Sequence, residues 1–438
     1  MSAERTADIE DLLDRPFGSW RLLIFLLCGV VMAIEGFDMY MLGSIVPALA
    51  AGLGVAPPAL ASVFVAQGIG LALGYTLIAP LADRFGRRPL ILLCVLGFGL
   101  ITLATTQARS LEQVAGLRFA AFLFFGGIMP NIISLIAEMA ALRIRSRQVV
   151  LLNACFALGA ALGSLIAPML VANFGWQGAF WAGGIAPLAL LPLLFFLLPE
   201  SARFLVVKGR PVEEVRKVLR PIVREAGEIA RFTTKEPSAG KIPIAAIFSD
   251  GRLANTLLFM LAGGMMMLVG NLVASWAPTY WHFVSGFEMR EAAALFATSS
   301  LGAIVWPFAM IVLIPAIGLQ RAVILCYALG AVSMLIYVIQ PFTAPLAIFL
   351  AVTYGAFVVG AISGLYALIA AAYPTHMRAT ALGWTSGIGR LLAITGPAIG
   401  GYMLASQQGP VAISLAFAIP LAIAGLAIAA VRLRTDKA

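Results

Sequence analysis

Long apolar stretches recur along the whole chain, and they constrain the fold more than any other feature. Each holds about 20 residues or more, which as a helix is enough to cross about 30 Å of hydrocarbon. They are too long and too uniformly apolar for barrel strands, so helices remain as the way to satisfy the backbone in lipid. We predict an all-α membrane protein with twelve spans, at residues 21–48, 58–82, 89–107, 112–141, 147–172, 177–198, 253–280, 289–314, 320–340, 343–372, 378–404 and 410–432.

The composition agrees with a membrane location. Hydrophobic residues make up 61% of the 438 residues and charged residues only 11%, with a mean hydropathy of +0.99. A soluble protein of this length would lack the charges to cover its surface. The four cysteines fall in predicted spans, and no His/Cys cluster has metal-ligand spacing, so neither a metal nor a cofactor is expected.

The basic residues predict the orientation. With the N-terminus in the cytoplasm, all but four of the 29 Lys and Arg residues fall on cytoplasmic segments. Arg109 and Arg290 fall outside, and Arg118 and Arg390 lie within spans. This positive-inside pattern predicts cytoplasmic termini in a bacterial-type inner membrane, and it explains the net charge of +9 without a nucleic-acid partner. No cleavable signal peptide is visible, so the first span is expected to direct insertion.

A polar stretch between the sixth and seventh spans divides the chain. We predict an N-terminal six-helix bundle with a cytoplasmic tail (1–198), a cytoplasmic linker with short amphipathic helices (199–252) and a C-terminal six-helix bundle (253–438). The halves repeat at an offset of about 233 residues, and such pseudo-symmetric repeats are a transporter architecture with a binding cavity at the midplane. The shift aligns Asp38 with Asn271, Gly86 with Gly318, Arg145 with Arg378 and Gly163 with Gly396.

The differences between the repeats point to a function. Asp38 is matched by the neutral Asn271, Arg118 by Ala351, and Arg390 by Ala157. The N-terminal half therefore keeps the acids within its spans, whereas the C-terminal half keeps a single deep cation. This asymmetry suits a site that handles a proton on one side and an anion on the other.

The turn after the second span reads PLADRFGRRP (80–89). Gly86 permits a tight turn, and Asp83 is placed to accept from a helix N-terminus or to pair with Arg87 or Arg88. These contacts predict a gating latch that closes the cytoplasmic side; the alternative is a basic loop that only sets topology. The motif closely resembles the signature of the major facilitator superfamily, although Ala79 stands where that signature usually has Gly.

Longer segments resemble the aromatic acid:proton symporter family within that superfamily. They are EGFDMYMLGSIVPAL (35–49), RFAAFLFFGGIMPNIISLIAE (118–138), NLVASWAPTY (271–280) and SGLYALIAAAYPTHMRATALGWTSGIGRLLAITGPAIGG (363–401). Arg378 and Arg390 fall at the family's arginine positions, and Glu35 stands where the family usually has Asp. The resemblance implies the superfamily's fold and a non-enzymatic symporter that imports an aromatic carboxylate with a proton by alternating access.

Two arginines lie at depths where an unpaired charge is costly. Arg390 follows Arg378 by about 18 Å of helix, which places it near the midplane if Arg378 lies at the cytoplasmic surface. It is expected to grip a substrate carboxylate or, alternatively, to form a permanent ion pair with an acid on another helix. Arg118 matches the depth of Asp38, so we predict that they pair; the alternative is that Arg118 snorkels outward.

The remaining polar candidates keep several roles open. Asp38 is the first candidate to take the transported proton, and its protonation would free Arg118. Glu35 lies one turn from Asp38 on the same face and is a second proton carrier, a substrate contact or a modulator of the pKa of Asp38. Glu138 is expected to form a cytoplasmic salt bridge between helices. Asn131 follows Pro130 within a span and either binds substrate or makes a helix-to-helix hydrogen bond.

Further residues are candidates for holding an aromatic ring. Packing and membrane-interface roles are the alternative for each of them. The candidates for the substrate site are Asn271 and the aromatic residues Phe37, Trp276, Tyr366 and Trp384, with Phe124 and Phe125 nearby.

The favoured function is therefore proton-coupled import of a small aromatic carboxylate by a monomer in the lipid bilayer, driven by the proton gradient. Proton-antiport efflux of drugs or organic anions is the first alternative, but Gly159 and Gly163 of the fifth span lack the adjacent Gly-Pro common in drug antiporters. A ligand-binding membrane sensor is the second alternative, and the short loops and tails hold no recognisable signalling domain.

Overall fold

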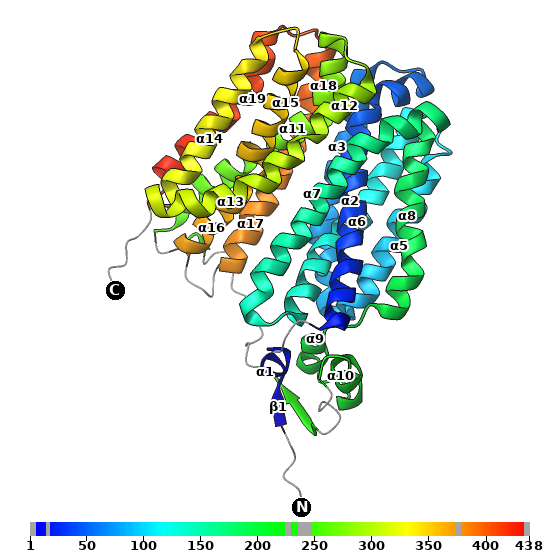
Figure 1. Ribbon diagram of the computed structural model, residues 1–438, viewed down its shortest axis with the longest axis vertical. Helices are drawn as coiled ribbons and strands as arrows, with labels where there is room; N and C mark the ends of the chain where they lie inside the picture. Colours follow the sequence, from blue (N-terminus) through cyan, green and yellow to red (C-terminus); the bar gives the residue numbers. More distant parts are fainter. Residues whose placement is uncertain are drawn as a thin grey trace, which may run out of the picture.

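The computed structural model describes residues 6–14, 18–223, 229–234, 247–249, 251–373 and 378–432. Within these residues, 12 helical runs are long and apolar enough to cross a membrane. Their ends fall within a few residues of the predicted spans, so the predicted pattern is confirmed. Figure 1 shows the helices gathered in two bundles, one from each half of the chain.

The N-terminal half holds six of these runs, and its second run changes helix type four times. The elements are α2 (Ser19–Leu53), η1 (Pro57–Leu60), α3 (Ala61–Leu73), η2 (Gly74–Ile78), η3 (Ala79–Leu81), α4 (Ala82–Phe85), α5 (Arg87–Thr105), α6 (Leu111–Met139), α7 (Leu142–Phe174) and α8 (Trp176–Leu197).

The C-terminal half holds the other six runs. The elements are α11 (Leu253–Ser285), α12 (Met289–Ala297), α13 (Ser299–Ile317), α14 (Leu319–Leu335), η6 (Ile336–Val338), α15 (Ala344–Tyr354), η7 (Gly355–Val359), α16 (Ile362–Ala372), α17 (Arg378–Ala393), α18 (Thr395–Ala405) and α19 (Pro410–Ala430).

Matching turns support the internal repeat. Gly86 joins α4 to α5 with φ 106° and ψ 157°, and Gly318 joins α13 to α14 with φ 86° and ψ 153°. Residues with side chains rarely adopt these positive φ values. The two aligned glycines therefore make the same turn for the same steric reason.

The sequence predicts continuous spans, but the structure interrupts several of them. The segments η2 and η7 are π-helical, and a break at Ile394 separates α17 from α18. At η2, a side chain added at Gly74 would lie 2.4 Å from the carbonyl oxygen of Leu123 on α6. Glycine therefore allows the two backbones to touch where the helix changes type, and π turns of this kind are frequent at functional sites.

The two halves meet directly on one side of the bundle. We call this the far side; the opposite side, which carries the Gly86 turn and the connecting segment, is the basic side. The Thr279 hydroxyl donates to the Gly43 carbonyl at 3.2 Å. A side chain added at Gly401 would lie 2.5 Å from the Cβ atom of Ala61. The far side is thus closed, because the backbones of the two halves approach each other closely there.

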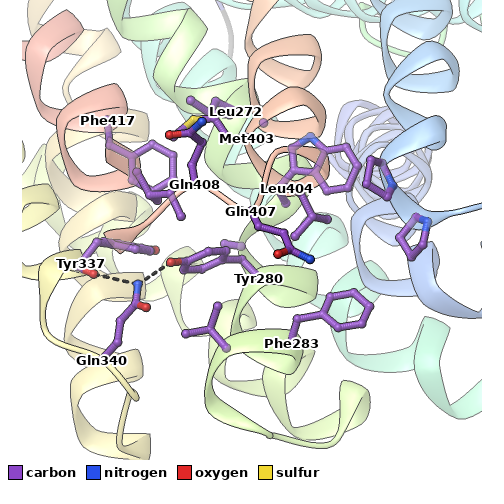
Figure 2. Close-up of a pocket in the computed structure, with 17 residues that line it drawn as sticks. Leu272, Tyr280, Phe283, Tyr337, Gln340, Met403, Leu404, Gln407, Gln408 and Phe417 are labelled. Atoms are coloured by element: carbon purple, nitrogen blue, oxygen red, sulfur yellow. Dashed lines mark hydrogen bonds between the residues drawn. The ribbon is translucent and has the colours of Figure 1, made fainter. Parts of the chain in front are cut away.

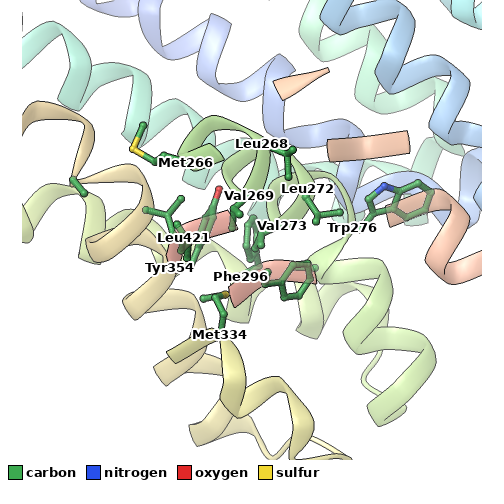
Figure 3. Close-up of a cluster of buried hydrophobic side chains, with 14 of the residues drawn as sticks. Met266, Leu268, Val269, Leu272, Val273, Trp276, Phe296, Met334, Tyr354 and Leu421 are labelled. Carbon is green, nitrogen blue, oxygen red and sulfur yellow. The ribbon is translucent and has the colours of Figure 1, made fainter. Parts of the chain in front are cut away.

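The apolar interior has two large clusters: one lies within the N-terminal half, and the other fills the C-terminal half and continues into the far-side part of the N-terminal half. In the C-terminal half, α11 contributes Val269 and Val273, which pack with Tyr354 and Leu421 of other helices (Figure 3). All four side chains are buried. Lipid is as apolar as these side chains, so close packing rather than escape from water holds such helices together.

A small subdomain lies on the basic side beneath the N-terminal bundle (Figure 1). The strands β1 (Thr6–Asp8) and β2 (Arg231–Thr233) pair in parallel, with Ala7 opposite Phe232. They join α1 (Ile9–Leu13), α9 (Ala202–Val207) and α10 (Val212–Leu219) around a shared apolar cluster. The sequence assigned the tail to the N-terminal bundle, but the structure packs its described part with the connecting segment.

The amphipathic run that begins at Val212 is shorter than its pattern suggests. Helix α10 ends at Leu219, and the chain later enters β2. Arg220 keeps helical geometry, but Pro221 has no backbone N–H to continue the hydrogen-bond ladder, which explains the early end. The two short strands are the one departure from the all-α prediction within the described residues.

Candidate functional site

The predicted pair of Asp38 and Arg118 is confirmed. Both side chains are fully buried between α2 and α6. Arg118 Nη1 donates to Asp38 Oδ1 at 3.2 Å, and Nη2 donates to Oδ2. The guanidinium also lies 4.9 Å from the ring centre of Phe122 and 5.2 Å from that of Phe180. The two hydrogen bonds and the two aromatic faces hold the guanidinium in place, and they compensate a charge that would be costly if it were unpaired at this depth.

Gln67 on α3 completes this pair, and the sequence analysis missed it. With its amide oriented to satisfy both groups, the carbonyl oxygen accepts from Arg118 Nε at 3.2 Å and from Nη2 at 2.9 Å. Gln67 also lines a cavity of about 60 Å³ between the halves, together with Tyr40, Asn271 and Ser275. The predicted substrate residue Asn271 therefore lies beside the ion pair, on the facing half.

Glu35 has quite different surroundings, although it lies one turn from Asp38. Its side chain is 1% exposed. The backbone N–H of Met129 on α6 approaches its carboxylate, and neither oxygen accepts a hydrogen bond from a described side chain. The acid therefore forms no part of the Asp38–Arg118 network, and the two acids of the first span have different surroundings.

Arg390 meets an aromatic ring from the other half. Its guanidinium carbon lies 3.8 Å from the ring centre of Tyr75 on η2. The Tyr75 hydroxyl contacts the Met129 sulfur at 3.2 Å and is within electrostatic range of Glu35 and Tyr366. No described carboxylate pairs with Arg390, so the alternative of a permanent ion pair is not what the structure shows.

The cluster of Glu35, Tyr75, Tyr366 and Arg390 joins both halves near the middle of the spans. Tyr366 on α16 is held in place because Ser386 of α17 donates to its hydroxyl at 3.0 Å. Sequence reasoning missed Tyr75, which stands in an apolar run before the Gly86 turn. The π turn that carries it leaves no signal in the hydropathy pattern.

Asn131 makes the helix-packing contact that the sequence left as an alternative to substrate binding. Its amide nitrogen donates to the Gly127 carbonyl at 2.7 Å and to the Ala79 carbonyl at 3.3 Å. The side chain thus joins α6 to η3 next to Pro130, where α6 lacks a backbone donor. With both contacts made, a substrate role for Asn131 stays a prediction.

For three aromatic candidates, the described contacts do not include Arg390. Trp276 donates from its indole nitrogen to the Pro397 carbonyl at 2.9 Å and lines a pocket on the far side. The backbone of Phe37 touches Gly163 of α7, so this stretch of α2 serves helix packing. Trp384 is 39% exposed. Their predicted contact with an aromatic substrate therefore stays a prediction, whereas Tyr366 does lie in the cluster.

The predicted latch residues form a network on the basic side. Arg87 pairs with Asp83 at 3.1 Å and with Glu138 at 3.0 Å, which confirms the salt bridge predicted for Glu138. Arg88 donates to the Phe195 carbonyl at 2.6 Å. These contacts all join elements of the N-terminal half, so a latch that spans the two halves stays a prediction.

Glu200 anchors this network, and the sequence analysis missed it as well. Its carboxylate accepts from the backbone nitrogens of Arg87 at 2.9 Å and Ser201 at 2.8 Å. Burial raises the pKa of Glu200 above its ordinary value, while these N–H donors act in the opposite direction. The signal in the sequence was an acid directly after the sixth span. The side chain of Arg378, another gating candidate, lies outside the described side chains.

Two bundles of six helices with buried charges at their shared face define a membrane transporter of the two-repeat class. Comparison with known proteins gives the family. The pattern of the Major Facilitator Superfamily matches residues 28–392. The chain belongs to this superfamily, which confirms the predicted fold and the prediction of a membrane transporter rather than an enzyme.

Relatives and solved structures agree with this placement. The gallate transporter of Pseudomonas putida is 33% identical over 98% of this chain and 97% of its own length. The 4-hydroxybenzoate transporter of Pseudomonas aeruginosa is 33% identical over 98% and 96%. The 3-(3-hydroxy-phenyl)propionate transporter of Escherichia coli is 31% identical over 94% of each.

The same fold occurs in an inward-open structure of the Escherichia coli xylose transporter. The two superpose with a TM-score of 0.76 at 16% sequence identity, over 95% of this chain and 98% of the other. At this level of identity the likeness supports the architecture alone.

Proposed function

We propose that this protein imports a small aromatic carboxylate together with a proton by alternating access. In this proposal a single chain works in a bacterial-type inner membrane, with both termini in the cytoplasm, and uses the proton gradient without a cofactor. The observation that carries it is Arg390, which lies 3.8 Å from the Tyr75 ring centre and is paired with no described carboxylate.

The cluster suits both parts of such a cargo. A guanidinium binds a carboxylate through two parallel hydrogen bonds, and an aromatic face accepts a second ring. Arg390 supplies the first group, and Tyr75 and Tyr366 supply the second. The relatives named for gallate, 4-hydroxybenzoate and hydroxyphenylpropionate each carry a cargo with one aromatic ring and one carboxylate. We infer the same class of cargo here.

We assign the transported proton to Glu35 first and to Asp38 second. A proton that reaches Glu35 breaks no ion pair and no side-chain hydrogen bond with a described residue, because only the backbone N–H of Met129 approaches the carboxylate. A proton that reaches Asp38 must disrupt the two-point contact with Arg118. This reverses the order in which the sequence ranked the two acids, and it leaves the Asp38–Arg118 pair as the element that responds when the site is loaded.

The contacts between the halves suggest the step that the structure represents. They gather on the far side, which corresponds to a state that releases cargo to the basic, cytoplasmic side. The backbone contacts at Gly43 and Gly401 would then separate when the halves rock to receive cargo from outside. The Arg87 network would reorganise in the same movement.

The test is uptake into vesicles that contain the purified protein. We expect labelled 4-hydroxybenzoate to accumulate against its gradient when the outside is acidic, and a protonophore to abolish that accumulation. Glu35→Gln should lose accumulation but keep exchange of labelled for unlabelled cargo, since exchange needs no net proton movement. Gradient-driven accumulation by Glu35→Gln at the wild-type level would contradict the proton assignment. Net export would contradict the direction.

A further inference from the structure

A second pocket, of about 470 Å³, opens on the far side of the C-terminal half (Figure 2). It lies among the ends of α11, η6 and α18 and the start of α19. Trp276 and Arg390 are separated in this arrangement, because Trp276 packs against Gly400, ten residues and about 15 Å of helix beyond Arg390. The pocket is therefore distinct from the cluster around Arg390.

The lining of this far-side pocket is aromatic and uncharged. Rings come from Trp276, Tyr280, Phe283, Tyr337 and Phe417, and side-chain amides come from Gln340, Gln407 and Gln408. No Lys, Arg, His, Asp or Glu lines it among the described residues. A carboxylate would find no cation here, whereas an uncharged ring with a hydroxyl group finds ring faces and neutral hydrogen-bonding groups.

The polar side chains of the pocket keep some of their hydrogen-bonding groups free for a ligand. Gln340 donates to the Tyr280 hydroxyl and, at 3.1 Å, to the Tyr337 carbonyl. This fixes Tyr280 with its hydroxyl hydrogen free to donate. Figure 2 shows the Gln407 side chain beside Tyr280 and Leu404. Within the described residues Gln407 is the one non-glycine with positive φ, at 49°. This left-handed residue ends α18, because the Gln408 N–H donates to the Met403 carbonyl at 3.0 Å, and both Gln407 and Gln408 line the pocket.

The pocket also includes a wall from the other half of the protein. Pro57 and Pro58 of η1 face the C-terminal residues. A side chain added at Gly401 would lie 3.2 Å from the Pro58 carbonyl, so α18 and η1 touch here. A ligand that fills the pocket contacts both halves while the far side is closed, and it therefore stabilises that state over one in which the halves separate.

We propose that the far-side pocket is a second binding site, for an uncharged single-ring phenol, and that its occupant holds the far side closed. Binding itself does not depend on the proposed cargo. The inhibition that follows rests on the proposed uptake by alternating access. Cargo from outside drives the far side closed, and an occupant that binds then slows the reopening of the far side. Excess cargo outside therefore does not relieve the inhibition.

The probe is methyl 4-hydroxybenzoate, an uncharged ester that lacks the carboxylate for Arg390. We expect it to raise the melting temperature of the wild-type protein and of Arg390→Ala. Leu404→Trp fills the pocket and should abolish the shift, while Leu415→Trp, an exposed position outside the lining, should keep it. Gln407→Leu removes one polar group without filling space and should weaken the shift, which tests the site even if Leu404→Trp fails to fold.

Transport gives the second measurement. We expect the ester to lower the maximal rate of 4-hydroxybenzoate uptake by the wild type and to leave uptake by Leu404→Trp unaffected. Several results overturn the proposal: no shift with the wild type, a shift lost in Arg390→Ala but kept in both Leu404→Trp and Gln407→Leu, or inhibition that saturating cargo relieves. If the ester raises the melting temperature in detergent but not in lipid vesicles, the pocket is instead assigned to a lipid acyl chain. If uptake is absent but the shifts follow this pattern, the proposed function fails and the second site stands.

Discussion

The two halves of this protein follow one helical plan but handle charge in opposite ways. The N-terminal half pairs its buried charges internally: Asp38 with Arg118 in the middle of the spans, and Arg87 with Glu138 at the basic side. The C-terminal half places one cation, Arg390, in the middle of its spans, and that cation meets a ring from the other half.

The difference is between charge contacts within one bundle and a charge contact between the two bundles. Ion pairs closed within one bundle survive a rocking motion, because their partners move together. A contact between Arg390 and Tyr75 crosses the bundles, so it has to change when they move. Under the proposed function, the N-terminal half holds and exchanges charge, and the cargo contact lies where the halves separate.

The largest expected effect tests whether the Asp38–Arg118 pair holds the N-terminal half together. Asp38→Asn leaves the fully buried Arg118 without a counter-charge, which should lower the free energy of unfolding by about 3–5 kcal/mol. Glu35→Gln is the matched control and should destabilise far less, since Glu35 forms no ion pair with a described residue and Gln keeps an oxygen for the Met129 N–H. Thermal unfolding in detergent compares them, and equal melting of Asp38→Asn and wild type would contradict the structural role.

The second prediction tests the cation of the C-terminal half. Arg390→Lys keeps the charge but loses two-point recognition of a carboxylate, so cargo affinity should fall by about 10-fold or more. Calorimetry with 4-hydroxybenzoate measures the change. Arg84→Lys, at an exposed arginine on α4, is the control and should bind as the wild type does. Unchanged affinity in Arg390→Lys would move the anion site elsewhere.

A smaller effect is expected at the ring that joins the halves. Tyr75→Leu removes the ring face that we propose for the cargo; a contact between two rings is worth about 0.5–1.5 kcal/mol, which corresponds to a roughly 2- to 13-fold loss of cargo affinity. Tyr75→Phe keeps the ring and should lose much less. The same binding measurement compares the two variants, and equal losses would show that the hydroxyl, rather than the ring, is what matters.

The smallest effect concerns Glu200 on the basic side. Burial raises its folded-state pKa above the ordinary value of 4.5, so between these two values the folded protein binds more protons than the unfolded chain. This contribution to stability is complete below pH 4.5 and is lost as the pH rises through the folded-state value. Glu200→Gln should remove that slope.

Melting temperatures measured from pH 4 to pH 8 check the Glu200 prediction. Glu214→Gln, an exposed acid on α10, serves as the control and should leave the wild-type slope in place. An identical slope in Glu200→Gln would assign the pH dependence to other groups.

Much of the fold could be predicted from hydropathy and helix length along the sequence. Lipid requires helices of a set length, so hydropathy predicted the spans to within a few residues. The connecting segment was harder, because β1 and β2 are 3 residues each and lie more than 200 residues apart. Such short strands are stable here through a shared cluster that includes Ile9 and Phe232, and no local pattern announces it.

The sequence by itself determined the depth of the charged residues along the membrane-spanning helices. Because a helix rises by a constant amount per residue, it placed Asp38 and Arg118 at one level and Arg390 near the midplane. Only the tertiary structure decided which side chains at a given depth face each other. That choice depends on helix rotation, glycine contacts and the π turn at η2. These features set Gln67 against Arg118 and Tyr75 against Arg390, and they left Glu35 without an ion-pair partner among the described residues.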